Sequence, residues 1–168
     1  PADMTWKSGV DVLSFGATKG GALAAEAVIL FDVKKADELM YRRKRGGHLL
    51  SKNRFTAAQL LAFLDDDLWL KNAAHANDMA ARLARGISQS NKLRHAFDVD
   101  ANMQFIIMTI AVHEWLQSAG ARYYTWPGRG PRGAGAKRDD EVISRFVCGF
   151  STTPEEVDEF VAVVGLLG

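Results

Sequence analysis

Apolar residues follow two different patterns along this chain, and the change of pattern predicts where strands give way to helices. Residues 11–15 and 27–31 are mostly apolar at consecutive positions, which is typical of strands buried on both faces. We therefore expect them to be strands from the inner part of an α/β sheet. A short turn that contains Lys19 and two glycines lies between them.

From residue 34 onward the apolar positions recur at helical spacing. The pattern predicts a helix from residue 36 that stops at Gly46 and Gly47. A second helical stretch is expected over residues 49–68, with an acidic run, residues 65–67, on its outer side. A third helix is expected over residues 73–87, with Gly86 as its closing residue.

A polar stretch without periodicity, residues 88–91, indicates a domain boundary nearby. We expect one domain over residues 1–92 and a small α/β domain over residues 93–168. The second should have the order strand, helix, strand, strand, helix (βαββα), over residues 104–110, 111–118, 121–126, 143–150 and 154–164. Thr152 or Thr153 should cap the last helix, and the Gly-, Pro- and Arg-rich loop at 127–140 should be mobile.

The charge balance, the lengths of the apolar stretches and the cysteine and histidine content limit what kind of protein this can be. Lys and Arg number 21 against 20 for Asp and Glu, so a net charge of +1 gives no global attraction for nucleic acid or an anionic membrane. The apolar stretches are too short to span a membrane. The single Cys148 excludes an internal disulfide, and the four histidines are not at metal-ligand spacing, so we expect no metal. With no leader segment apparent, a cytoplasmic protein is expected.

Lys19 is the first candidate for chemistry. It follows a strand-like run in the sequence SFGATKGG, and the carboxyl ends of strands are where ligands bind in open α/β sheets. Partial desolvation there would favour the neutral amine that covalent catalysis requires. Gly20 and Gly21 allow a ligand close to the backbone, and Thr18 can offer its hydroxyl to an anion. Taken alone, a lysine in this position is more often an ordinary surface residue of a turn.

Two other basic features have competing interpretations. The run at 42–45 could contact nucleic acid, but without interleaved aromatic residues a solvated helix end is commoner. Arg145 lies next to Phe146 and Val147 in an apolar strand, where a guanidinium is costly unless an anion pairs with it. It could also be a surface charge on an edge strand. Neither Ser14 nor Ser51 has the sequence of a hydrolase nucleophile turn.

The longer string DVLSFGATKGGALAAEAVILFD resembles the cofactor-lysine segment of the low-specificity L-threonine aldolases, whose usual form is Ser-Phe-Gly-x-Thr-Lys-Asn-Gly. Three more segments resemble the same family, so the resemblance covers essentially the whole chain: YRRKRGGHLLSKNRFTAAQLLAFL, LWLKNAAHANDMAARLA and RFVCGFSTTPEEVDEFV. Gly20 stands where the family usually has asparagine.

This resemblance implies a lyase of the aspartate-aminotransferase-like fold (fold type I) that uses pyridoxal phosphate to split β-hydroxy-α-amino acids into glycine and an aldehyde. Lys19 matches the lysine that binds the cofactor as a Schiff base, with Thr18 beside it. Arg145 matches the arginine that holds the substrate carboxylate. Lys44 and Lys52 lie where the family has its active site and subunit contact, so Lys52 is a candidate for the cofactor phosphate and Lys44 for the substrate.

The resemblance also implies that the chain is the C-terminal half of such an enzyme. The family places the phosphate-binding turn, the histidine that stacks on the cofactor and the aspartate that protonates its ring upstream of this sequence. We therefore expect the isolated chain to be inactive, and to associate with itself as a homo-oligomer or with a missing N-terminal half. Two alternatives stay open: another fold-type-I enzyme such as a β-eliminating lyase, and a noncatalytic interaction fragment.

Overall fold

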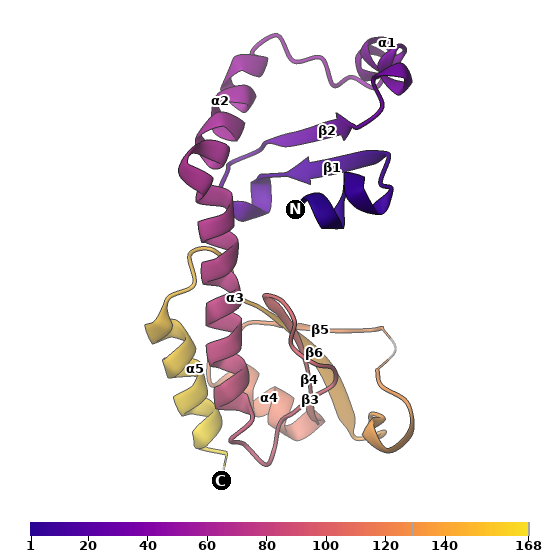
Figure 1. The fold of residues 1–168 in the computed structure, drawn as a ribbon. Coiled ribbons are helices and arrows are strands. Elements are labelled where there is room, and N and C mark those ends of the chain that lie inside the picture. The colour runs from indigo at the N-terminus through magenta and orange to yellow at the C-terminus, as the bar shows by residue number, and fades with distance from the viewer. Residues whose placement is uncertain (129, 168) are drawn as a thin grey trace. The chain divides into compact units, whose positions relative to one another are not determined.

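The computed structural model describes residues 1–128 and 130–167, and the chain divides into two compact units, Pro1–Lys71 and Asn72–Gly168 (Figure 1). The division falls inside helix α3, Leu68–Ile87. The sequence led us to expect a domain boundary between residues 92 and 93, and that boundary stays a prediction. Arg129, in the loop expected to be mobile, lies outside the described residues.

The first unit contains a two-stranded antiparallel hairpin of β1, Val12–Gly16, and β2, Glu26–Leu30. Both strands lie within one residue of their predicted positions. The expectation that they are buried on both faces is wrong for this chain, because neither strand contains a fully buried residue. Among the described residues β1 and β2 pair only with each other. Leu60, Phe63 and Trp69, from the helices that follow, pack against the hairpin, and much of its surface stays exposed.

Two helices follow the hairpin, α1, Leu39–Arg45, and α2, Asn53–Leu64. The predicted stop of the first helix at the glycine pair is confirmed, since α1 ends before Gly46. The predicted second helix was too long, because α2 ends at Leu64. Asp66 and Asp67 take φ angles of 48° and 54°, a left-handed conformation that aspartate tolerates but a helix does not continue through.

Helix α3 begins five residues earlier than predicted, at Leu68, and ends as predicted at Ile87. Gly86 is a residue of the helix and not its closing residue, which corrects the sequence interpretation. A Cβ atom at Gly86 would collide with the side chain of Val161 on helix α5, Pro154–Gly165. Glycine is therefore suited to this position because it allows the two helices to approach closely.

The second unit is a four-stranded antiparallel sheet with helices (Figure 1). The sheet order is β3-β4-β6-β5. The elements are β3 Arg94–His95, β4 Met103–Thr109, α4 Ile110–Ser118, β5 Tyr124–Thr125, β6 Glu141–Val147 and α5 Pro154–Gly165. All five predicted elements are present in the predicted order, although β5 is much shorter than expected. The two-residue strand β3 was not expected.

The helices of this unit pack on one face of its sheet. The main core joins Ile106 and Met108 of β4 and Phe146 of β6 to residues of α3, α4 and α5. Residues that alternate with these point to the opposite face, where Ile107 and Ile143 form a smaller cluster without any helix residue. Arg145 lies two residues after Ile143 and so belongs to this second face.

No helix in the described part of the chain is both long enough and apolar enough to cross a membrane.

Candidate functional site

The predicted cofactor lysine lies in a compact loop that joins β1 to β2. The backbone N–H of Ala17 donates to the carbonyl of Ala25 at 2.9 Å, and the N–H of Ala25 donates to the hydroxyl oxygen of Thr18 at 3.1 Å. Both alanines are fully buried. Because the Thr18 oxygen acts as an acceptor here, its hydrogen stays free to donate to an oxygen of a ligand. Gly21, with a φ of 132°, turns the chain after Lys19 in a way that favours glycine.

The amine of Lys19 has no hydrogen bond or ion pair among the described residues, and the side chain is exposed. Three other lysines of this unit pair with carboxylates: Lys7 with Asp3 at 3.2 Å, Lys35 with Asp11 at 2.7 Å and Lys71 with Asp66 at 2.6 Å. An unpaired amine is chemically available to a ligand. The first unit does not provide the desolvation that we expected around it, and the role of Lys19 stays a prediction.

Lys44 and Lys52 lie near the ends of the two helices that follow the hairpin. Lys44 is in the last turn of α1, and Lys52 is the residue before α2. Both are exposed. Within residues 1–71 no hydrogen bond or ion pair joins either side chain to Lys19 or Thr18. Their predicted roles toward phosphate and carboxylate therefore have no geometric support yet and stay predictions.

Arg145 is a partly buried arginine without an acidic partner in the described chain. It lies in β6, opposite Phe105 of β4 and Tyr124 of β5, and its Nε is buried without a hydrogen-bond partner. Its guanidinium carbon lies 6.0 Å from the ring centre of Trp126. Four other arginines do have carboxylate partners: Arg42, Arg82, Arg94 and Arg138. Since an unpaired buried charge is costly, this guanidinium is suited to an external anion.

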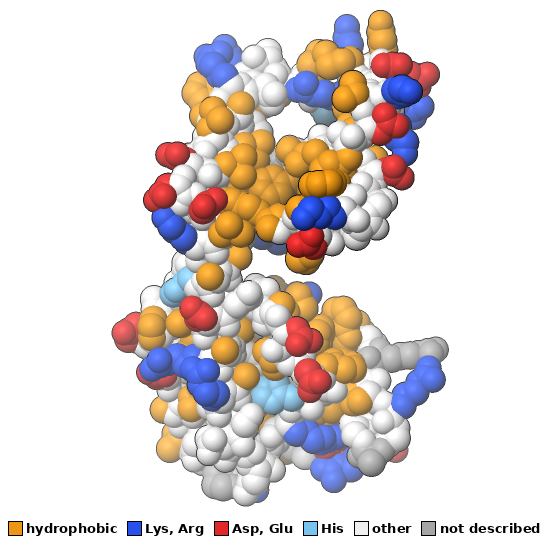
Figure 2. All heavy atoms as spheres, viewed as in Figure 1, with side chains coloured by type: hydrophobic (Ala, Val, Ile, Leu, Met, Phe, Trp, Pro, Cys, Tyr) orange, Lys and Arg blue, Asp and Glu red, His pale blue; other side chains and the backbone are white. Residues whose placement is uncertain are grey.

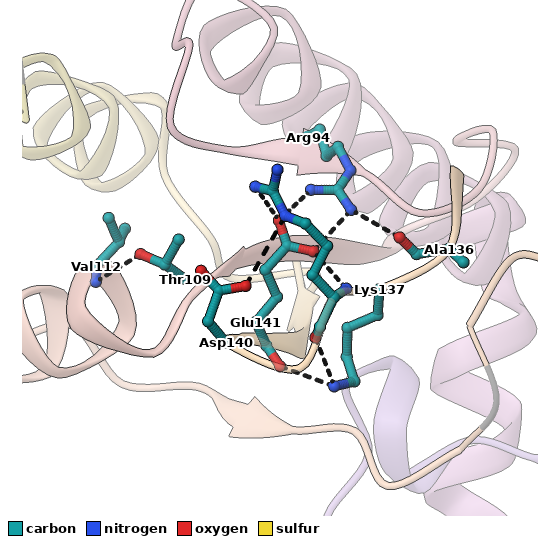
Figure 3. A network of polar contacts seen from close by, with 8 residues as sticks. Arg94, Thr109, Val112, Ala136, Lys137, Asp140 and Glu141 are labelled. Atoms are coloured by element: carbon teal, nitrogen blue, oxygen red, sulfur yellow. Dashed lines mark hydrogen bonds and ion pairs between the residues drawn. The ribbon is translucent and has the colours of Figure 1, made fainter. Parts of the chain in front are cut away.

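The strand that carries Arg145 is fixed at its beginning by a polar network (Figure 3). The carboxylate of Glu141, buried at 3% exposure, accepts two hydrogen bonds from Arg94 at 2.6 and 2.9 Å. It also accepts from the backbone N–H and the guanidinium of Arg138, each at 2.8 Å. Lys137 donates to the Glu141 carbonyl at 3.0 Å. These bonds hold the residues before β6 against β3.

The same donors change the acidity of Glu141. The Arg94 guanidinium is the main cause that lowers the pKa of Glu141 from 4.5 to about 2, although burial opposes this change. The carboxylate is therefore charged at neutral pH. With all these donors already bound to it, Glu141 serves structure and not proton transfer.

The other candidate nucleophiles and ligands have structural roles. Three of the four histidines bind neighbouring groups: His75 the Thr152 carbonyl at 2.7 Å, His95 the Gln104 side chain at 3.0 Å and His113 the Tyr123 hydroxyl at 3.2 Å. Cys148 is buried, and burial raises the pKa of its thiol. No three His, Cys, Asp or Glu residues in the described ranges are gathered so that they could hold a metal ion.

A cavity of about 650 Å³ lies beside the loop that precedes β6, lined by Trp126, Arg132 and Lys137 among others. Neither Lys19 nor Arg145 lines it. We do not take it as the candidate site, because it contains neither of the two residues that match the family's cofactor lysine and carboxylate-binding arginine.

Sequence reasoning missed several residues around the two candidates. Gln59 and Phe63 of α2 contact the Lys19 loop. Their spacing of four residues places them on one helix face, and this was the available signal. Trp126 was also missed, because its position beside Arg145 depends on the pairing of β5 with β6, next to which its N–H donates to the Ile143 carbonyl at 2.7 Å.

The chain is similar to two curated bacterial proteins, both low-specificity L-threonine aldolases. The protein from Pseudomonas sp. (strain NCIMB 10558) is 39% identical over 162 residues, which cover 96% of this chain and 43% of the relative. The protein from Pseudomonas aeruginosa is 38% identical over 167 residues, which cover 99% of this chain and 45% of the relative. The chain thus spans less than half the length of these relatives. No protein-family model matches it.

Solved structures give the same picture for the fold. Leishmania major threonine aldolase matches 94% of this chain and 43% of its own, with a TM-score of 0.82 at 26% identity. Sphingomonas wittichii serine palmitoyltransferase matches 96% of this chain and 40% of its own, with a TM-score of 0.64 at 14% identity. The aminotransferase TlmJ from Streptoalloteichus hindustanus matches 93% and 52%, with a TM-score of 0.55 at 16% identity. The predicted α/β fold of a type I pyridoxal-phosphate enzyme is confirmed.

Proposed function

We propose that this chain, which is similar to two low-specificity L-threonine aldolases over less than half of their length, is the C-terminal half of a pyridoxal-phosphate-dependent lyase of that family. The reaction proposed is cleavage of L-threonine-like β-hydroxy-α-amino acids to glycine and an aldehyde. The observation that carries this proposal is the similarity to two L-threonine aldolases over 96% and 99% of the chain. Two cationic groups without partners in the described chain, those of Lys19 and Arg145, support it.

Lys19 and its neighbours fit a role in holding the cofactor. Pyridoxal phosphate, when bound, supplies an aldehyde that condenses with amines and a ring that withdraws electrons from the substrate. The Lys19 amine, free of intramolecular partners, would hold the aldehyde carbon. The Thr18 hydroxyl has its hydrogen available for a phosphate oxygen, because its oxygen already accepts from Ala25. Lys52 is a second candidate for that phosphate.

Arg145 would hold the substrate carboxylate. Its planar guanidinium can form two parallel hydrogen bonds to a carboxylate, and no acid in the described chain competes for it. A held carboxylate restricts how the amino acid can rotate, and this restriction decides which bond at its α-carbon is aligned for cleavage. We propose Lys44 as an additional cation for the same carboxylate.

The remaining catalytic parts are proposed to come from outside this chain. The three histidines with described partners are used in structural hydrogen bonds, so the group that takes the proton of the β-hydroxyl is proposed to lie in the other half of the relatives' length. We propose that this half, or further copies of the chain, assembles with it. A cytoplasmic location fits a single buried cysteine without a disulfide.

Reductive trapping tests the role of Lys19. The chain is incubated with pyridoxal phosphate, reduced with borohydride, digested and analysed by mass spectrometry. We expect the phosphopyridoxyl label on Lys19 to exceed that on the exposed Lys44 and Lys52 by about tenfold, because a shaped loop adds contacts that a surface lysine lacks. Lys19→Arg is the matched control and should lose this label alone.

Equal labelling of all exposed lysines would contradict the assignment of Lys19.

Product analysis tests the reaction itself: the chain supplied with the N-terminal part of a Pseudomonas relative should release glycine and acetaldehyde from L-threonine. Lys19→Ala should lower that turnover by about a thousandfold or more. Turnover of L-threonine by the 168-residue chain alone would contradict the proposed need for a second part.

A further inference from the structure

The hairpin itself fixes part of the loop that carries Lys19 and leaves two backbone N–H groups of the loop to a partner outside the hairpin. Gly20 and Gly21 follow the lysine directly, and glycine has more backbone freedom than any other residue. Hydrogen bonds within the hairpin fix the first part of the loop: the N–H groups of Gly20 and Ala22 both donate to the Ala17 carbonyl at 3.0 Å. The hairpin provides no such acceptor for the next two N–H groups.

Those two N–H groups, of Leu23 and Ala24, both donate to one side-chain oxygen on helix α2. They lie 2.9 and 3.1 Å from Oε1 of Gln59, which is 36 and 35 residues further along the chain. The amide nitrogen of Gln59 donates to the Phe55 carbonyl in its own helix at 3.3 Å. Because the nitrogen end has an acceptor within the helix, the oxygen end is directed at the loop.

The same helix face contacts the loop again next to Lys19. Phe63 is one turn after Gln59 and is buried at 7% exposure. Its Cζ lies 2.6 Å from the position that a Cβ atom at Gly20 would occupy. The ring would have to shift to accept any side chain at this position, including the asparagine of the resembled family. Helix α2 therefore holds the loop at two points, directly after the lysine and four to five residues beyond it.

We propose that Gln59, supported by Phe63, is a positioning residue for Lys19. The two hydrogen bonds to Leu23 and Ala24 fix the far side of the loop, and the ring of Phe63 fixes the near side, so that the lysine backbone is held before any ligand arrives. Such preorganisation lowers the entropy lost when the amine reacts. The inference rests on the proposed function, in which Lys19 is the residue that reacts with the cofactor.

The test compares four variants of the chain by two measurements. Gln59→Leu removes the acceptor oxygen. Gln59→Asn shortens the side chain by one methylene, so that its oxygen no longer reaches the loop. Gln59→Glu keeps an acceptor oxygen at the same distance along the side chain. Gln89→Leu is the matched control, since Gln89 is exposed on the other unit. The first measurement is amide hydrogen exchange at Leu23 and Ala24 without cofactor, and the second is the rate of reductive trapping of Lys19 with pyridoxal phosphate.

Gln59→Leu and Gln59→Asn should raise exchange at Leu23 and Ala24 by about tenfold, as expected for loss of hydrogen bonds to the loop. Both should slow trapping of Lys19 by about threefold to tenfold, and labelling of Lys44 should not change. Gln59→Glu should restore both readouts. Gln89→Leu should alter neither, and the thermal midpoints should show that each variant is folded.

Unchanged exchange at Leu23 and Ala24 in both Gln59→Leu and Gln59→Asn would overturn the inference, as would faster exchange with unaltered trapping of Lys19. Failure of the proposed function is a different result. In that case the unaltered chain is not labelled preferentially at Lys19, while the exchange data, which need no cofactor, still decide whether Gln59 holds the loop.

Discussion

At the scale of a single residue, the buried carboxylate of Glu141 makes the stability of the fold depend on pH. Its carboxylate accepts bonds from Arg94 and Arg138, and these bonds lower its pKa from 4.5 to about 2 in the folded chain. In the unfolded chain the group titrates near its ordinary value. The stabilisation is therefore complete above about pH 4.5 and is lost as the pH falls toward 2, because protonation then favours the unfolded state.

We predict that Glu141→Gln removes this part of the pH dependence. At pH 7 the variant should lose about 2 kcal/mol of unfolding free energy, since the charge-assisted bonds to Arg94 become neutral ones. Between pH 4.5 and 2.5 its stability should fall less steeply than that of the unaltered chain. Urea unfolding followed by circular dichroism measures the unfolding free energy at pH 7 and its change with pH. Glu114→Gln, an exposed position, is the control, and an identical slope in the Glu141 variant would contradict the prediction.

At the scale of elements, helix α5 has a well-defined beginning. The hydroxyl of Thr153 accepts from the N–H of Glu156 at 3.2 Å, and the Glu156 carboxylate accepts from the N–H of Thr153 at 2.8 Å. Pro154 occupies the first turn, where no backbone N–H is needed. The reciprocal pair satisfies N–H groups that would otherwise lack partners at the helix start.

Removal of this cap should weaken the second unit. We predict that Thr153→Ala lowers the free energy of unfolding by about 1 kcal/mol, because the N–H of Glu156 loses its acceptor. Thr153→Ser keeps the hydroxyl and should lose only a small part of that unfolding free energy. Chemical denaturation of both variants checks this, and equal stability of the alanine and serine variants would show that the cap does not contribute.

The elements differ in how far the sequence predicts them. Consecutive apolar residues located β1 and β2, and the Thr-Pro signal located the start of α5, because both depend on neighbours in the sequence. The exposure of β1 and the role of Gly86 could not be predicted, since they depend on what packs against each residue. The candidate site divides in the same way: Lys19 has a local motif, whereas Gln59 acts on a backbone segment 35 residues earlier.

At the scale of the whole molecule, the first unit exposes much apolar surface. Figure 2 shows hydrophobic side chains gathered over α2 and the hairpin, and the exposed ones on these elements include Val28, Leu61 and Leu64. Among the described residues each strand of the hairpin pairs along one edge only. Apolar patches and free strand edges both favour association with another chain.

We predict that the purified chain associates with itself. Sedimentation velocity should show species larger than the 18.4 kDa monomer, and raised salt should not disperse them because apolar contacts are not screened. Leu61→Lys and Val28→Lys should shift the distribution toward the monomer. Leu166→Lys, an exposed apolar position on the other unit, is the control. A monodisperse monomer at all concentrations would contradict this prediction.

The buried Cys148 provides the chain with a natural reporter. It is the only thiol in the sequence, it is 4% exposed, and burial disfavours its reactive thiolate. Alkylation by a maleimide must therefore wait until the core around it opens, so the labelling rate gives the opening frequency of the second unit without an engineered probe. Mass spectrometry of the labelled chain can then show how denaturant or a bound partner changes this opening frequency.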